Sequence, residues 1–224
     1  MGTTVISIRV GPEPSHTDFT IHENLLRKSS PFFEAALGRE WLESEERVVR
    51  LPTNGAKAFQ VYSQWLYTGR LHTRASSDRL SFHEEKEEWD CLVGAYLLGE
   101  YLQEITFRDS VMDAMQEWVQ LCHYTSFNVY EQATEIYDNT SSGSPLRLLV
   151  TDLTVWRAFD HFWIEEQKLL FPPEFAWSLA TGLWTRLTGR ASLLGDNEPF
   201  AERKDTCYYH CHKLQPCYKG THQL

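Results

Sequence analysis

The sequence predicts a mixed α+β protein, with a small sheet of short strands near the N-terminus and helices after it. Two observations indicate the sheet: apolar residues alternate with others over residues 4–10, and a proline-containing turn leads to a second alternating segment. A third indicates the helices, because apolar residues from Phe59 onward recur at steps of three and four. The fold class is therefore a short-stranded sheet flanked by helices, followed by an all-helical extension.

Three segments account for the expected sheet. Residues 4–10 form a half-buried strand, and residues 11–15 contain two prolines and a glycine, so they read as a turn. Residues 18–21 complete a hairpin with this strand. Residues 47–51 form a third strand, which Pro52 closes.

Two short helices are expected between the hairpin and the third strand. The first contains Leu25 and Leu26. The second begins at Ser30-Pro31, because serine is a good N-cap and proline fits the first helical position, and it ends at Gly38. Longer helices follow, over residues 54–68, 89–97, 107–122, 126–137 and 146–170, and again from Pro173.

Composition limits the function. The chain has 224 residues and a formal net charge of −10, and its Lys and Arg residues are scattered, so a nucleic-acid-binding surface is not expected. No apolar run reaches the roughly 20 residues of a membrane span. The N-terminus lacks the apolar core of a signal peptide, so a cytoplasmic or nuclear location is expected, with the five cysteines as thiols.

An ordered set of motifs resembles the BTB/POZ family. The family pattern is an extended segment, a histidine, paired leucines, a Ser-Pro-Phe-Phe start, a Glu-Ser pair, a strand ending in Leu-Pro and a helix ending in Leu-Tyr-Thr-Gly. The matching segments are Phe19-Thr20-Ile21-His22-Glu23-Asn24-Leu25-Leu26, Ser29-Ser30-Pro31-Phe32-Phe33, Glu43-Ser44, Val49-Arg50-Leu51-Pro52, Ala58-Phe59 and Trp65-Leu66-Tyr67-Thr68-Gly69. The resemblance covers about Val5 to Leu121, roughly half of the chain.

The resemblance implies three parts. Residues 1–122 correspond to the BTB/POZ domain, 123–187 to a helical extension and 188–224 to an irregular tail that contains Cys and His. The segment Ser144-Pro145-Leu146-Arg147 and the tail are similar to extensions of fungal BTB proteins. Many family members carry an aspartate before the first strand, at a buried dimer contact. Thr3 and Thr4 stand there instead, which weakens the expectation of a strand-swapped homodimer.

Each matching residue is first expected to serve the fold. Phe19 should pin the hairpin onto helices, and His22 should satisfy backbone groups at a strand-to-helix junction. Phe32 and Phe33 should both anchor the second helix, and Gly69 should take the left-handed C-terminal conformation. The complete set of structural motif residues is Phe19, His22, Leu26, Ser30, Phe32, Phe33, Trp65, Tyr67 and Gly69.

The tail carries the sharpest candidate metal site. Cys207, Cys211, His212 and Cys217 offer soft thiolate and imidazole donors that suit tetrahedral zinc, with His222 as an alternative fourth ligand. The set lacks the second paired unit of a standard zinc finger. The alternative is a tail of loose thiols, or one packed on the helices, with no cofactor.

No catalytic motif is present, so we expect a non-enzymatic protein-interaction module that binds other proteins by self-association or as an adaptor. The alternative is a substrate-recruiting adaptor of a cullin-type ubiquitin ligase. Trp41, Leu42 and Glu43 match the apolar-x-Glu element through which some BTB proteins contact a cullin; otherwise they form a capped loop in which Trp41 covers the core. A third hypothesis is a small metal-dependent enzyme or regulator that uses the tail.

Overall fold

The computed structural model describes residues 3–38, 47–73, 81–121, 129–157, 171–188, 207–212 and 216–222. The chain divides into two compact units, residues 1–114 and 115–224. The division falls inside helix α6 (Ile105–Leu121). The described residues form the mixed α and β structure that the sequence predicts.

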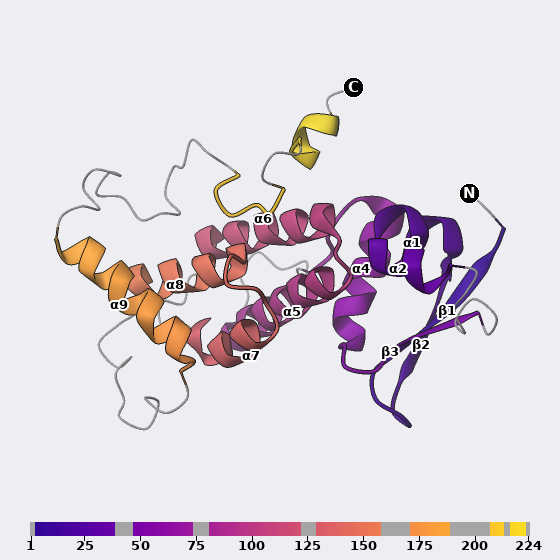
Figure 1. The fold of residues 1–224 in the computed structure, drawn as a ribbon, viewed down its shortest axis with the longest axis horizontal. Helices are drawn as coiled ribbons and strands as arrows, with labels where there is room; N and C mark the ends of the chain where they lie inside the picture. The colour runs from indigo at the N-terminus through magenta and orange to yellow at the C-terminus, as the bar shows by residue number, and fades with distance from the viewer. Residues whose placement is uncertain are drawn as a thin grey trace. The chain divides into compact units, whose positions relative to one another are not determined.

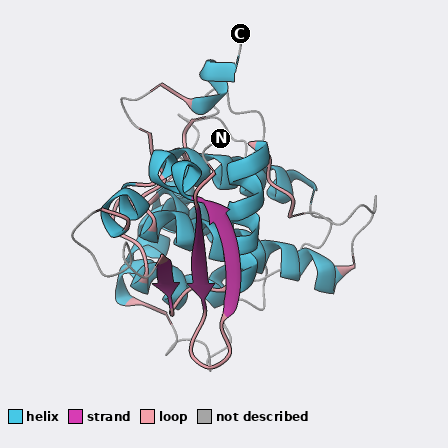
Figure 2. Cartoon of the chain, turned by 90° about the vertical axis from the view of Figure 1, so that its right-hand side faces the viewer, coloured by secondary structure: helices cyan, strands magenta, loops and turns pink. Residues whose placement is uncertain are grey.

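The sheet of the first unit has three strands in the order β2-β1-β3 (Figure 2). Strands β1 (Val5–Val10) and β2 (Thr17–His22) are antiparallel, with Ile8 opposite Phe19, so the predicted hairpin is confirmed. Strand β3 (Val48–Leu51) runs parallel to β1, with Val49 opposite Ile8. A parallel neighbour requires a crossover connection, and the chain between β2 and β3 supplies it.

The two faces of the sheet differ in chemistry. One is apolar and buried, formed by Ile6, Ile8, Val10, Ile21, Val49 and Leu51. On the other, Arg9 of β1 pairs with Asp18 of β2 at 3.2 Å. This alternation follows from the period of two along a strand and places the helices against one face only.

Three helices accompany the sheet, α1 (Glu23–Ser29), α2 (Pro31–Ala36) and α4 (Ala56–Thr68) (Figure 1). Their ends match the sequence signals. The Ser30 hydroxyl caps α2 by accepting from the Phe33 N–H, and Gly69 ends α4 with φ +67°. Both ends were predicted, because serine satisfies a free N–H and only glycine adopts a positive φ at low cost.

Helix α5 (Phe82–Tyr101) begins with a capping box between Ser81 and Glu84. Near its end, a Cβ on Gly99 would lie 2.7 Å from the Arg108 side chain and 3.0 Å from Phe107. The absence of a side chain at Gly99 therefore lets the last turn of α5 approach the first turns of α6 closely.

The second unit contains η1 (Val129–Gln132), α7 (Ala133–Asp138), α8 (Pro145–Arg157), α9 (Pro173–Leu187) and η5 (Tyr218–His222). The single helix expected over 126–137 is replaced by a 3₁₀ turn and the short α7. The helix expected over 146–170 is described as far as Arg157, and the remainder of that prediction lies outside the described residues.

Arg147 joins α7, α8 and α9. Its side chain is 9% exposed and donates to the Tyr137 carbonyl at 2.6 Å, to the Thr140 hydroxyl at 2.9 Å and to Glu174 at 2.5 Å. The guanidinium also lies over the Tyr137 ring, 4.4 Å from its centroid. A planar group with five donors can satisfy this many acceptors at once, so the buried charge is compensated. Ser144-Pro145-Leu146-Arg147 thus acts as a structural start to α8.

Candidate functional site

The strongest candidate site is a group of four metal-ligand side chains in the tail, Cys207, His210, His212 and Cys217. One potential donor atom from each, a thiol sulfur or an imidazole nitrogen, lies within 4.8 Å of the other three. Residues so placed are the donors that structural zinc sites use. The predicted Cys/His cluster is therefore present, with a changed membership.

Two tight turns bring these four residues together. The His210 N–H donates to the Cys207 carbonyl at 2.9 Å, which closes a turn and sets the first thiol beside the first imidazole. The Gly220 N–H donates to the Cys217 carbonyl at 2.9 Å, so Cys217 stands directly before the 3₁₀ turn η5. Each thiol thus lies where the backbone reverses, a position from which a short segment can direct several side chains to one point.

The geometry of the group fits a tetrahedral ion. Zn–S bonds of about 2.3 Å and Zn–N bonds of about 2.0–2.1 Å place ligand atoms about 3.3–3.8 Å apart. The Cys217 Sγ lies 3.8 Å from the His210 Nδ1. Both ring nitrogens of His212 are buried and, among the described residues, have no hydrogen-bond partner. A buried imidazole without a partner is costly unless a ligand completes it.

The group differs from the predicted ligand set in one member. Cys211 is described and half-buried, but the cluster contains His210 in its place. Residues 210–212 lie outside helix and strand, with a bend at Cys211, and the donor atoms of His210 and His212 both belong to the group. The spacing Cys207-x2-His210 could have identified His210 as a candidate from the sequence. The prediction chose Cys211 instead, because it paired the two cysteines. The side chain of His222, the alternative fourth ligand, lies outside the described part of the chain.

The cluster is anchored to helix α8 by the residue beside it. Tyr209 is 1% exposed, and its hydroxyl donates to the Asp152 carboxylate at 2.7 Å. Tyr208 and His210 contribute to the wall of a surface groove between α8 and α9. Residues 207–212 are therefore packed on α8, as the alternative of a tail packed on the helices expects, and are not a loose segment.

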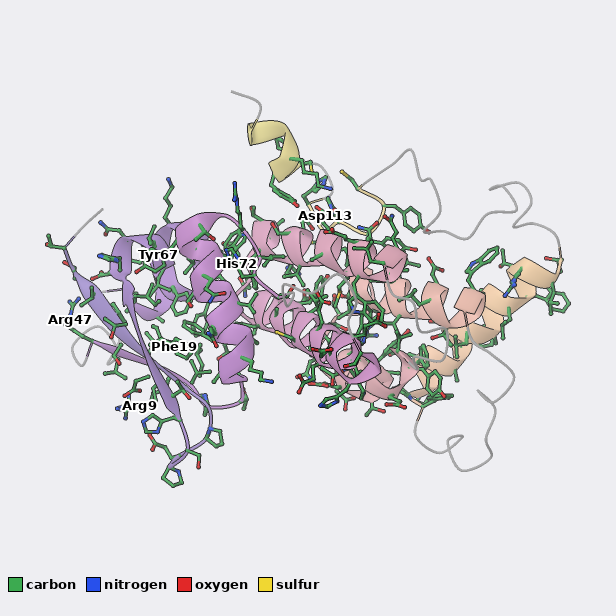
Figure 3. The ribbon with its side chains drawn as sticks, turned by 180° about the vertical axis from the view of Figure 1, so that it is seen from behind. Arg9, Phe19, Arg47, Tyr67, His72 and Asp113 are labelled. Carbon is green, nitrogen blue, oxygen red and sulfur yellow. The ribbon has the colours of Figure 1, made fainter. Side chains whose placement is uncertain are left out.

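In the first unit, His22 and Tyr67 meet. Each belongs to the structural motif set, and they lie 45 residues apart in sequence. The His22 N–H donates to the Tyr67 hydroxyl oxygen at 3.2 Å, and the same oxygen lies 2.7 Å from the His22 Nδ1 (Figure 3 shows Tyr67). The expected role of His22, satisfying backbone groups with its ring, was thus incorrect: its ring bonds a side chain.

Two neighbouring phenylalanines have different environments. Phe33 is fully buried and stacks on Tyr62 with centroids 6.4 Å apart. Phe32 is half-buried and contacts Tyr101 at 5.1 Å. Only Phe33 is therefore a full core anchor, because successive residues of a helix cannot both face the same side.

Ser30 does more than cap its helix. The side chain is buried, and its hydroxyl donates to the Leu102 carbonyl at 2.6 Å, at the end of α5. It thus links two elements 72 residues apart. Leu26, before it, is fully buried.

An aromatic cluster fills the space between sheet and helices. The ring of Phe19 in β2, labelled in Figure 3, has its centroid 4.8 Å from that of Phe59 in α4, which confirms that Phe19 pins the hairpin onto a helix. Tyr62 and Trp65 continue the cluster and both contact Phe107, at 5.0 and 5.1 Å. The structural motif residues therefore serve packing.

Glu104 is one of the buried acids of the first unit. It is 5% exposed, and burial, opposed by donors from the start of α6, raises its pKa to about 7. One carboxyl oxygen accepts from the Thr106 N–H at 3.0 Å; among the described residues, the other has no partner. Glu85, in the acidic run 84–88, is also buried, at 4% exposed.

The cullin-contact candidates Trp41, Leu42 and Glu43 lie outside the described residues. A surface that the sequence did not single out is found on α9 instead. Trp177 and Trp184 are 76% and 68% exposed. They are seven residues apart, so they lie on one helix face, and the exposed Leu187 follows three residues later.

No protein-family model matches this chain, and no curated protein matches its sequence. Among the helices that the structure describes, none combines the length and the apolar character needed to cross a membrane.

Proposed function

We propose that this chain is a non-catalytic protein-interaction module of the BTB/POZ type, which acts by self-association or as an adaptor. The observation that carries the proposal is the use of the motif residues. Spread from Phe19 to Gly69, they make packing contacts, helix ends and the His22–Tyr67 bond. Residues committed to a scaffold leave the outer surface to provide the function.

The strand arrangement supports the same reading. A β1–β2 hairpin extended by a parallel β3, with short helices α1 and α2 in the crossover, is the order that the sequence motifs imply. The exposed Trp177 and Trp184 add a second support, because tryptophan is enriched at protein contacts and often dominates their energy.

Self-association is tested by light scattering on the full chain at micromolar concentration. The proposal expects a particle of twice the 26.1 kDa chain mass that dissociates on dilution. A monomer at every concentration would contradict self-association and leave the adaptor role as the form of the proposal to be tested.

The second candidate is a substrate-recruiting adaptor of a cullin-type ubiquitin ligase. The pattern Trp41-Leu42-Glu43 favours it, and the exposed α9 face offers a place for a client. The test is binding of the purified chain to a purified cullin N-terminal region. Glu43→Lys should abolish binding, because a positive charge replaces the carboxylate that accepts the charge-assisted hydrogen bond. Glu46→Lys makes the same charge change outside the matching element and should leave binding intact. Equal binding by both variants would refute this contact.

We also propose that the metal of the tail group is zinc. Two thiolates with two imidazoles form a soft, four-coordinate donor set, which zinc prefers and which magnesium and calcium avoid. With four protein ligands the ion would have no open position for substrate, so the site is structural and consistent with a non-catalytic role.

A further inference from the structure

We infer that metal binding by Cys207, His210, His212 and Cys217 and docking of the tail on helix α8 are a single coupled event. The inference rests on the zinc assignment proposed above and is independent of the interaction role. It assigns the tail a function: a metal-fastened clasp on the second unit.

The first step is that the described tail buries little apolar surface. Residues 207–212 and 216–222 form turns and a short 3₁₀ helix. Among their described apolar side chains, only Tyr209 belongs to the buried core. Ordering a short irregular segment costs conformational entropy, and a metal cross-link between its residues would offset part of that cost.

The second step is that the ligand group and the docking contact share a backbone turn. Tyr209 stands between Cys207 and His210, inside the turn that the His210 N–H closes on the Cys207 carbonyl at 2.9 Å. Fixing Cys207 and His210 on one ion fixes this turn, and so aims the Tyr209 hydroxyl at Asp152 of α8, 2.7 Å away. Conversely, docking of Tyr209 on α8 holds the Cys207–His210 turn in the conformation that binds the ion.

The third step is that the side chains lie close to ligand geometry. The His212 nitrogens are buried without a partner among the described residues, and the 3.8 Å separation of Cys217 Sγ and His210 Nδ1 suits a shared tetrahedral ion. A site that needs little rearrangement binds more tightly, because less ordering is left to be done on binding.

Coupling of this kind is reciprocal. If the ion favours the docked tail, then the docked tail favours the ion by the same factor. Removing the Tyr209 hydroxyl, which does not belong to the ligand set, must therefore weaken metal affinity. A neutral-donor hydrogen bond to a charged group contributes enough for a loss of roughly 10-fold.

The test uses the untagged full chain. Elemental analysis should find one zinc per chain, and cobalt substitution should give the visible absorption of a tetrahedral thiolate site. Cys207→Ser and Cys217→Ser should lose the ion. Cys211→Ser should keep it, because Cys211 lies in the same turn region but outside the group. Loss in all three, or in none, would overturn the ligand assignment.

The coupling is read from zinc affinity measured by competition with a chelating dye. Tyr209→Phe should bind zinc with the same stoichiometry and roughly 10-fold weaker affinity, and Asp152→Asn should act in the same direction. The exposed Tyr208→Phe is the matched control and should match the unmodified chain. Stoichiometric zinc with unchanged affinity in Tyr209→Phe would overturn the clasp but leave the zinc assignment standing. A chain without zinc would overturn both, and the light-scattering result would be unaffected.

Discussion

Replacing Glu104 by glutamine should remove a pH dependence from the stability of the first unit. The carboxyl is 5% exposed, and its pKa is raised from the ordinary 4.5 to about 7, chiefly by burial. Donation from Thr106 and Phe107 and the charge of Arg108 oppose the rise but do not cancel it. An acid whose pKa is higher in the folded state holds its proton more tightly there. The Glu104 carboxyl therefore stabilises the fold fully below pH 4.5, and this contribution is lost as the pH rises to about 7.

The magnitude follows from the size of the shift. About 1.4 kcal/mol for each pKa unit gives a total effect of about 3 kcal/mol, of which about 2–3 kcal/mol falls between pH 5 and pH 8. Urea unfolding followed by tryptophan fluorescence at several pH values measures it. Relative to the glutamine variant, the unmodified chain should lose this amount of unfolding free energy as the pH rises from 5 to 8.

Glu84 supplies the matched control. Its pKa is lowered by hydrogen bonds from the Ser81 backbone and hydroxyl, and it is exposed. Its stabilising contribution is therefore present above the ordinary pKa and lost only as the pH falls below it, so Glu84→Gln should leave the slope between pH 5 and 8 unchanged. A Glu104→Gln slope equal to that of the unmodified chain would refute the assignment of a protonated buried carboxyl.

Two further substitutions test the packing and the helix ends by chemical denaturation. Phe33→Ala should cost about 3–5 kcal/mol because the ring is fully buried, and the half-buried Phe32→Ala should cost clearly less; equal losses would contradict the difference in burial. Gly69→Ala should cost about 1–2 kcal/mol because its φ is +67°, whereas Gly55→Ala, with φ −80° and open space around it, should change stability by less than about 0.5 kcal/mol.

Local chemistry is what made the strands and helix ends predictable. The alternation of Ile6, Ile8 and Val10 with polar neighbours depends only on the period of a strand, and it located β1 to within one residue. Ser30 and Gly69 were equally readable, because a cap acts on backbone groups a few residues away.

What could not be predicted depends on residues far apart in sequence. The Ser30 hydroxyl reaches Leu102, and the His22 ring finds Tyr67, across 72 and 45 residues. No local pattern reports such partners. The burial of Glu85 within the acidic run 84–88 also depends on distant residues, since a helix periodicity assigns a face without saying what covers it.

The candidate metal site of the tail was only partly predictable from the sequence. Its composition indicated a soft metal site, but the choice between His210 and Cys211 depended on which side chains follow the turn at Cys207. Composition names the donors, and backbone conformation selects among them. Sequence spacing alone therefore could not choose between His210 and Cys211 without knowledge of the turn at Cys207.

Buried aromatic residues and the exposed tryptophans of α9 bear on function in different ways. In the first unit Phe33, Phe59 and Tyr62 are fully buried, so changes there alter stability and reach binding only through it. On α9, Trp177 and Trp184 expose most of their surface, where they contribute little to folding and are available to a partner. Loss of binding with unchanged unfolding free energy therefore has to originate on such a surface, and that criterion separates an interaction module from a destabilised scaffold.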